Sequence, residues 1–260
     1  MDLKELEYKI HSEVRTRHPW ELARFQIACD IIEKHIGKEN LKVIFDIGCG
    51  DTFFLESISL RYPGCQYYGV DMALSEEVIA YKSFMLKSKN IFLFKEIDLA
   101  LSHCGQELSL ILLMDVLEHI SDDSAFLKML KEKEMITHQT SILITVPSYQ
   151  SLFCQHDIFL VHYRRYNNLE LKNLLNVSGY TLDKIGYFFL LLIIPRIVQV
   201  LKEKIFPPKK CITTGLSRWN GGEFKSKLLK RILILDYKFS KLFDNKVPGL
   251  SNFVVCRKSV

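Results

Sequence analysis

The sequence predicts an α/β fold: a mostly parallel sheet of seven strands with helices on both faces. Short apolar runs alternate with longer amphipathic segments, as in repeated strand–helix–strand units. Several runs are apolar throughout, which is typical of strands buried on both faces. A glycine turn, Gly48-Cys49-Gly50, follows the first run and leads into a helical segment.

The elements follow in order from these signals. Residues 2–37 predict two helices, with Pro19 in a first helical turn and Gly37 ending the second. Ser121 and Asn168 are the expected N-caps of two later helices. Strands are expected at 41–47, 66–70, 90–97, 108–114, 141–146, 180–188 and 252–257, and further helices at 51–62, 75–87 and 169–177. The last strand should pair with the sixth, with an insertion between them.

This reading divides the chain into four parts. They are an N-terminal helical cap or lid over 1–40, a core over 41–190, a basic helical insertion over 191–250, and the last core strand over 251–260.

Composition indicates a globular protein without a disulfide framework. The 260 residues are 48% apolar and 25% charged, which is ordinary for a globular chain. The seven cysteines are scattered without any C-x-x-C pair, so we expect reduced thiols and no zinc site. The charged N-terminus does not resemble a secretory signal, and we expect a cytoplasmic protein.

Charge is distributed unevenly along the chain. Residues 1–195 hold 20 Lys and Arg against 26 Asp and Glu, a net charge of −6, whereas residues 196–260 hold 15 against 4, a net charge of +11. Residues 225–243 place apolar side chains at helical spacing among lysines, which suits either an anionic membrane surface or packing on the protein itself. The apolar run within 187–201 is too short to span a membrane.

A peripheral position on the inner membrane face is therefore an open alternative for this chain. Nucleic acid is not expected as a partner, because the basic residues lie among aliphatic ones and no binding motif for DNA or RNA is present.

The glycine turn predicts a nucleoside-bearing cofactor. Asp71 follows Gly50 by 21 residues, a spacing that suits a carboxylate on a ribose diol. A dinucleotide turn needs a third glycine where Phe53 stands, which argues against an NAD-dependent oxidoreductase. Asp46 would repel a pyrophosphate but could hold an ammonium group, so the cofactor is expected to carry an amino acid.

These residues and several later motifs resemble the class I S-adenosylmethionine-dependent methyltransferases. Asp46-Ile47-Gly48-Cys49-Gly50-Asp51-Thr52 is similar to their first motif, with Thr52 in place of the last glycine. The resemblance covers about 41–190 and implies a Rossmann-like fold. Its other motifs are Ile97-Asp98-Leu99, Asp115-Val116-Leu117-Glu118-His119, Ile144-Thr145-Val146-Pro147-Ser148, the block from His156 to Tyr166, and Pro248-Gly249-Leu250-Ser251.

The resemblance implies S-adenosylmethionine as cofactor, with Asp71 on the ribose, Asp98 on the adenine edge and the glycine loop on the methionine portion. The implied cofactor residues are Asp46, Gly48, Gly50, Asp71, Met72, Asp98, Leu99 and Asp115.

We do not expect a bound metal ion, although one set of residues leaves a metal site open. Asp115, Glu118 and His119 resemble a set that binds a divalent cation in ubiquinone-biosynthesis O-methyltransferases. The same residues occur in methyltransferases that use no metal, where they shape the cofactor wall.

The loop after the fifth strand carries the candidates for acceptor chemistry. His156, Asp157 and His162 are candidate catalytic residues, because a histidine beside a carboxylate can act as a general base. Arg164, Arg165 and Tyr166 are candidate substrate-binding residues, since paired arginines hold phosphate or carboxylate groups. The alternative is a loop whose ion pairs are structural.

The sequence thus predicts O-methylation of a small or lipid-linked acceptor. N- or C-methylation of a small metabolite and a non-catalytic cofactor-binding subunit remain alternatives.

Overall fold

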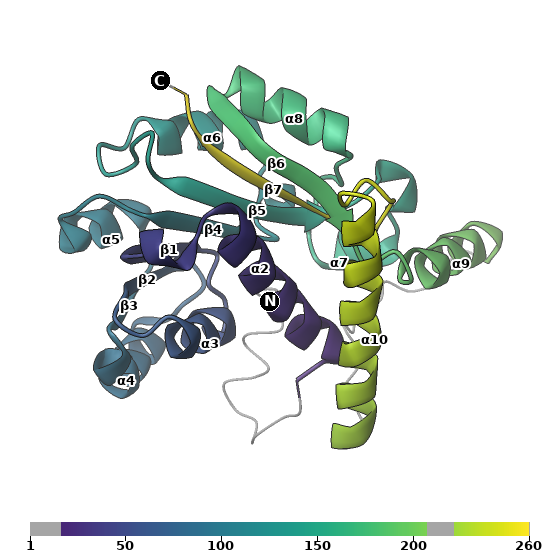
Figure 1. Ribbon diagram of the computed structural model, residues 1–260, viewed down its shortest axis with the longest axis horizontal. Helices are drawn as coiled ribbons and strands as arrows, with labels where there is room; N and C mark the ends of the chain where they lie inside the picture. The colour runs from purple at the N-terminus through teal and green to yellow at the C-terminus, as the bar shows by residue number, and fades with distance from the viewer. Residues whose placement is uncertain (1–16, 207–220, 260) are drawn as a thin grey trace.

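A seven-stranded sheet organises the molecule, in the order β3-β2-β1-β4-β5-β7-β6 (Figure 1). The computed structural model describes residues 17–206 and 221–259. The parallel neighbours are β3 (Ile91–Phe94), β2 (Gln66–Val70), β1 (Val43–Ile47), β4 (Leu110–Met114) and β5 (Ser141–Pro147). Strand β7 (Ser251–Lys258) runs antiparallel between β5 and β6 (Tyr180–Phe188). The predicted Rossmann-like, mostly parallel α/β fold is confirmed.

Helices cover both faces of the sheet and form two apolar layers with it. The layer on one face includes side chains of α2 (Pro19–His35), α3 (Phe53–Arg61), α4 (Glu76–Leu86) and α10 (Gly222–Leu242). The layer on the other face includes α5 (Ile97–Cys104), α6 (Asp123–Lys131) and α8 (Asn168–Val177). Strand β4 shows why its run is apolar throughout: Ile111 and Leu112 are fully buried in opposite layers.

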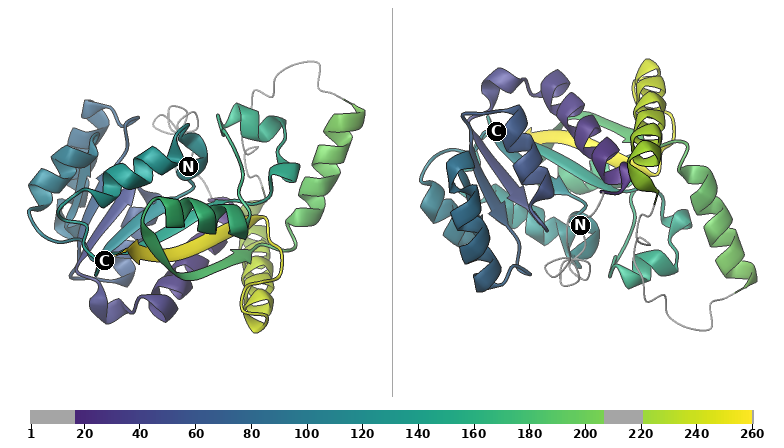
Figure 2. Two further views of the ribbon diagram at one scale, coloured as in Figure 1. Left: turned by 90° about the horizontal axis from the view of Figure 1, so that it is seen from above. Right: turned by 90° about the horizontal axis from the view of Figure 1, so that it is seen from below.

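Two further helices lie at one end of the sheet. Helix α7 (Gln155–Phe159) follows β5, and α9 (Ile193–Ile205) follows β6 and projects from the body of the molecule (Figure 2). Helices α9 and α10 occupy the predicted insertion between β6 and β7. Helix α10 packs on α2, where Tyr237 Oη and Lys241 Nζ donate to Asp30 Oδ2 at 2.9 and 2.8 Å. No helix in the described ranges is long and apolar enough to cross a membrane.

Several predicted boundaries need correction. The third strand ends at Phe94 instead of residue 97, because Ile97, Ala100, Leu101 and Cys104 recur at helical spacing and begin α5. Residues 51 and 52 belong to the glycine loop, and α3 starts only at Phe53.

Two N-cap predictions are each wrong by one residue. The Asp122 side chain, not that of Ser121, accepts from the Ala125 N–H at 2.9 Å and caps α6. Asn167, not Asn168, caps α8. Of the two helices predicted over 2–37, the second is present as α2, and the first lies outside the described residues.

Candidate active site

The glycine turn lies at the carboxyl end of β1, between the ends of β2 and β4. The Gly48 N–H donates to Val70 O at 2.7 Å, which fixes the turn on the end of β2. Gly48 has a φ of +75°, and a Cβ there would lie 2.7 Å from Val116 Cγ2. The chain can therefore pass this point only without a side chain, and the carboxyl edge of the sheet stays open.

Asp71 is held immediately beside the turn. Its Oδ2 accepts from the Gly50 N–H at 2.8 Å, and its Oδ1 accepts from the Ala73 N–H at 3.0 Å. The carboxylate is buried and keeps further acceptor capacity. Its position at the end of β2 is the one that the sequence spacing predicted.

Asp46 is the second carboxylate at the turn and is fully buried in β1. Burial and, to a smaller extent, the nearby negative charge of Asp71 together raise the pKa of Asp46 to about 7, against the lowering effect of Arg24. A cation placed against this carboxyl group would therefore favour its ionised form.

Thr52 occupies the position where the resemblance leads us to expect glycine. It adopts a φ of +68°, uncommon for a β-branched residue. Its hydroxyl lies 2.7 Å from Glu56 Oε1 and accepts from Lys82 Nζ at 2.6 Å. The turn therefore keeps its left-handed conformation despite the departure from glycine.

The other predicted cofactor residues follow β2, β3 and β4 in the chain. Met72 and Leu99 have exposed side chains, with Met72 83% exposed. Asp98 lies in the first turn of α5 and forms an ion pair with Lys133 Nζ at 2.6 Å. Asp115 forms an ion pair with Arg24 and accepts from Thr145 Oγ1 at 3.0 Å. If Asp98 or Asp115 bound a ligand, its carboxylate would do so while still paired with Lys133 or Arg24, respectively.

A cavity of about 540 Å³ adjoins the carboxyl ends of β4 and β5. Its walls come from the N-terminal end of α2, from α7 and the residues after it, and from α9 and α10. One part of the lining is polar and includes Glu118, His119, His156, His162, Arg165 and Arg196. Another part is apolar and includes Trp20, Leu160, Leu191, Leu192, Leu229 and Ile232.

Asp157 anchors the polar part of the cavity. It is fully buried; its Oδ1 accepts from Arg165 Nε at 2.8 Å and from His162 Nδ1 at 3.0 Å, and its Oδ2 accepts from the Cys154 N–H at 2.9 Å. Burial by itself would raise the pKa of Asp157, but the hydrogen bonds from His162 and Arg165 and the charge of Arg196 outweigh it and lower the pKa.

The two predicted catalytic histidines differ in their surroundings. His162 donates through Nδ1 to the Asp157 carboxylate, so its Nε2 carries the lone pair. His156 lines the same cavity, and burial, followed by the charge of Arg196, lowers its pKa to about 4. His156 is therefore neutral at physiological pH.

The three predicted substrate-binding residues lie in different surroundings, and only one of them lines the cavity. Arg165 lines the cavity, but its guanidinium is engaged by Asp157 and by Ser148 O. Arg164 forms an ion pair with Asp123 Oδ2 at 2.8 Å, and the buried Tyr166 Oη donates to the same oxygen at 2.8 Å. Arg164 and Tyr166 do not line the cavity, so their placement supports the structural alternative.

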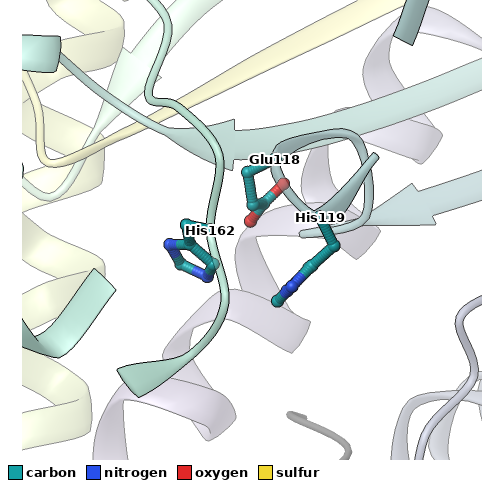
Figure 3. Close-up of side chains that lie close together, drawn as sticks. All are labelled: Glu118, His119 and His162. Carbon is teal, nitrogen blue, oxygen red and sulfur yellow. The ribbon is translucent and has the colours of Figure 1, made fainter. Parts of the chain in front are cut away.

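Glu118, His119 and His162 converge at the polar end of the cavity (Figure 3). One ligand atom from each lies within 4.8 Å of the other two, and the two imidazole centroids are 4.6 Å apart. Glu118 is fully buried, and neither of its carboxylate oxygens has a hydrogen-bond partner within the described part of the chain. Burial, followed by the charge of Asp115, raises its pKa well above the usual range.

The sequence reasoning did not include Arg196 as a site residue. Its Nη1 lies 2.6 Å from Cys154 Sγ and 3.7 Å from Asp157 Oδ2, and it lines the cavity. The only sequence signal for it is a single arginine within an amphipathic helix, which is equally typical of a solvent-exposed position.

Comparison with known proteins agrees with the geometry at the level of the fold. No protein-family model and no curated protein sequence matches the chain. Among solved structures, coclaurine N-methyltransferase has a TM-score of 0.55 at 14% identity, covering 92% of this chain and 70% of that one. The plantazolicin methyltransferase BamL has a TM-score of 0.53 at 15% identity, covering 91% and 86%.

A third structure limits what the fold implies. The [4+2]-cyclase SpnF has a TM-score of 0.53 at 11% identity and covers 96% of this chain and 85% of that one. The chain thus has the Rossmann-like methyltransferase fold, and because a cyclase shares it, the activity has to be argued from the site.

The glycine turn gives a direct test of this architecture. We expect Gly48→Ala to lower the free energy of unfolding by about 2–4 kcal/mol, because it adds a contact with Val116 to the left-handed strain. Gly105→Ala is the matched control, since Gly105 has a φ of +63° and no atom within 4 Å of an added Cβ. Urea denaturation measures both, and equal losses would contradict the close packing at Gly48.

Proposed function

We propose that this chain is an S-adenosylmethionine-dependent methyltransferase that methylates an oxygen atom of a small or lipid-linked acceptor. The observation that carries the proposal is the juxtaposition at one edge of the sheet. There, a glycine turn bound to a buried Asp71 is separated only by Glu21 and Arg24 from a cavity that is lined by His162, which donates to the buried Asp157.

The residues at the turn fit the cofactor chemically. Asp71 retains acceptor capacity for the ribose hydroxyls, and Asp46 lies where an ammonium group would gain a buried carboxylate. Met72 and Leu99 expose apolar side chains suited to the faces of an adenine ring. BamL and coclaurine N-methyltransferase, which share the fold, are described as complexes with SAH.

The cavity supplies the acceptor chemistry. When bound, S-adenosylmethionine provides an activated methyl group and leaves as S-adenosylhomocysteine. His162 would accept through Nε2 the proton that the acceptor hydroxyl loses, while Asp157 holds the ring through Nδ1 and stabilises the resulting imidazolium. His156, neutral and close to Arg196, would contact the acceptor without carrying charge.

A general base favours oxygen over nitrogen or carbon as the methylated atom. A hydroxyl is weakly nucleophilic until its proton is removed, whereas a neutral amine can attack directly. The lone pair of His162 would remove the proton of a hydroxyl acceptor, whereas a neutral amine would not need this step before it attacks.

Binding of the cofactor product should depend on pH through Asp46. An ammonium ligand favours the ionised carboxylate, so binding below pH 7 has to release the Asp46 proton. We expect the Kd for S-adenosylhomocysteine to rise toward tenfold per unit as pH falls below about 7, and to level off above it. Calorimetry between about pH 5.5 and 8.5 measures this.

Two variants control that titration. Asp46→Asn should bind more weakly and lose the pH dependence, and Asp71→Ala should lose most of the affinity. A wild-type Kd that does not change with pH would contradict the role of Asp46. Tight NAD binding would contradict the proposed cofactor.

Catalysis should depend on His162. We expect His162→Gln to lower methyl transfer by about 10²–10⁴-fold with little change in affinity for S-adenosylhomocysteine, because a base is lost and the cofactor residues are not. Transfer of labelled methyl groups to phenols and lipid-linked alcohols measures the rate. The exposed His138→Gln is the matched control. If the wild type transfers no label to any acceptor, a non-catalytic subunit becomes the better interpretation.

A second candidate is methyl transfer assisted by a divalent cation at Glu118, His119 and His162. The buried Glu118 carboxylate without a partner favours it, because such a group is costly unless a cation or a proton neutralises it. Two imidazoles and one carboxylate suit Zn²⁺, Mn²⁺ or Fe²⁺. The Nδ1 bond of His162 to Asp157 is the support that ligating histidines usually have. A cation there would lower the pKa of an acceptor hydroxyl.

Metal content distinguishes the two candidates. If the cation site exists, the protein incubated with Zn²⁺ or Mn²⁺ and then desalted should retain about one equivalent. Glu118→Gln should then lower metal affinity by at least about tenfold. Metal-free wild-type protein with full activity would leave His162 as the base.

A further inference from the structure

Helix α9 presents its apolar side to solvent. Its exposed apolar residues recur every three or four positions and therefore lie in one stripe, with exposed fractions between 41% and 68%. They are Ile194, Ile197, Val198, Leu201 and Ile205. The polar side of the helix faces the protein: Arg196 contacts Cys154, and Glu203 Oε2 accepts from the Gln155 N–H at 2.9 Å. A helix of a globular domain normally has the opposite orientation.

Helix α10 also carries an exposed apolar stripe, although it buries Leu233 in the core. Its apolar stripe is 38–80% exposed and consists of Phe224, Leu228, Ile232, Leu235, Phe239 and Leu242. The side that packs against α2 carries Tyr237 and Lys241, both bonded to Asp30. Two consecutive helices thus each expose an apolar stripe, and a large exposed apolar surface marks an interaction site.

Basic side chains accompany both stripes. Helices α9 and α10 together contain nine Lys and Arg against three Asp and Glu. Lys202, Lys204, Lys225, Arg231 and Lys238 are exposed. Apolar side chains combined with cations suit the boundary of an anionic lipid layer, where the first enter the acyl region and the second meet the headgroups.

Both helices also line the cavity. Leu229 and Ile232 of α10 line it while remaining 37% and 38% exposed, and Pro195 and Gln199 line it from α9. Both helices lie at the same end of the molecule (Figure 2). The same cavity has the histidines at its polar end, so an amphiphilic molecule fits it with an apolar chain against Leu229 and Ile232.

We propose that the exposed stripes of α9 and α10 form a docking surface for an anionic membrane, from which an amphiphilic molecule enters the cavity. That this molecule is the methyl acceptor rests on the proposed function, whereas the docking does not. A second copy of the chain fits the surface less well, because pairing two such faces would bring their lysines and arginines together.

Sedimentation with vesicles tests the docking. We expect the full chain to bind vesicles of phosphatidylcholine with 30% phosphatidylglycerol at least tenfold more tightly than vesicles of phosphatidylcholine alone, with loss of binding at high salt. The double variant Leu201→Ser with Leu235→Ser should reduce binding at least tenfold. Both residues are more than half exposed, so the fold should tolerate the change.

The matched control is Leu60→Ser with Phe84→Ser, which removes two even more exposed apolar side chains from α3 and α4 and should leave vesicle binding unchanged. Absence of wild-type binding to the anionic vesicles would overturn the proposal. So would a dimer in analytical ultracentrifugation that the Leu201/Leu235 variant abolishes while vesicles do not bind. Binding of S-adenosylhomocysteine, measured separately, tests the proposed function and does not bear on this result.

Discussion

The site depends on one constraint, the parallel pairing of β1 with both β2 and β4. This arrangement makes the chain cross over in opposite directions on the two sides of β1 and leaves a crevice at its carboxyl end. Gly48 turns there with a positive φ, its N–H is fixed on Val70, and Gly50 donates to Asp71. The positions of Asp46 and Asp71 at one edge follow from that register.

A second buried carboxylate, Asp157, holds the other half of the site together. Arg165, His162 and the backbone of Cys154 donate to it, and Arg196 brings α9 against the same group. Removing one partner from such a network would leave a buried charge uncompensated. Glu118 lies nearby, but within the described residues no donor reaches its carboxylate oxygens. Unlike Asp157, it therefore needs a proton or a cation to offset the cost of its burial.

The insertion between β6 and β7 joins the cavity to the outer surface. Helix α9 contacts the body of the protein through Arg196 and Glu203, and α10 through Leu233, Tyr237 and Lys241, and each helix leaves a further apolar stripe exposed. The same helices line the cavity, and Ile232 belongs both to the apolar lining and to the exposed stripe of α10.

The sequence by itself determined the strands, the glycine turn and the carboxylate at the end of β2, because hydrophobic periodicity and turn chemistry are local properties. It misplaced the end of β3 by three residues, because Ile97 begins α5, and two helix caps by one residue each, where a neighbouring polar side chain could serve equally well. It could not separate Arg165 from Arg164, or find the pairs Arg24–Asp115 and Arg196–Asp157. It also revealed that α10 is amphipathic but not which side faces outward. Those features depend on contacts between residues far apart in the chain, which only the folded sheet and its crossovers bring together.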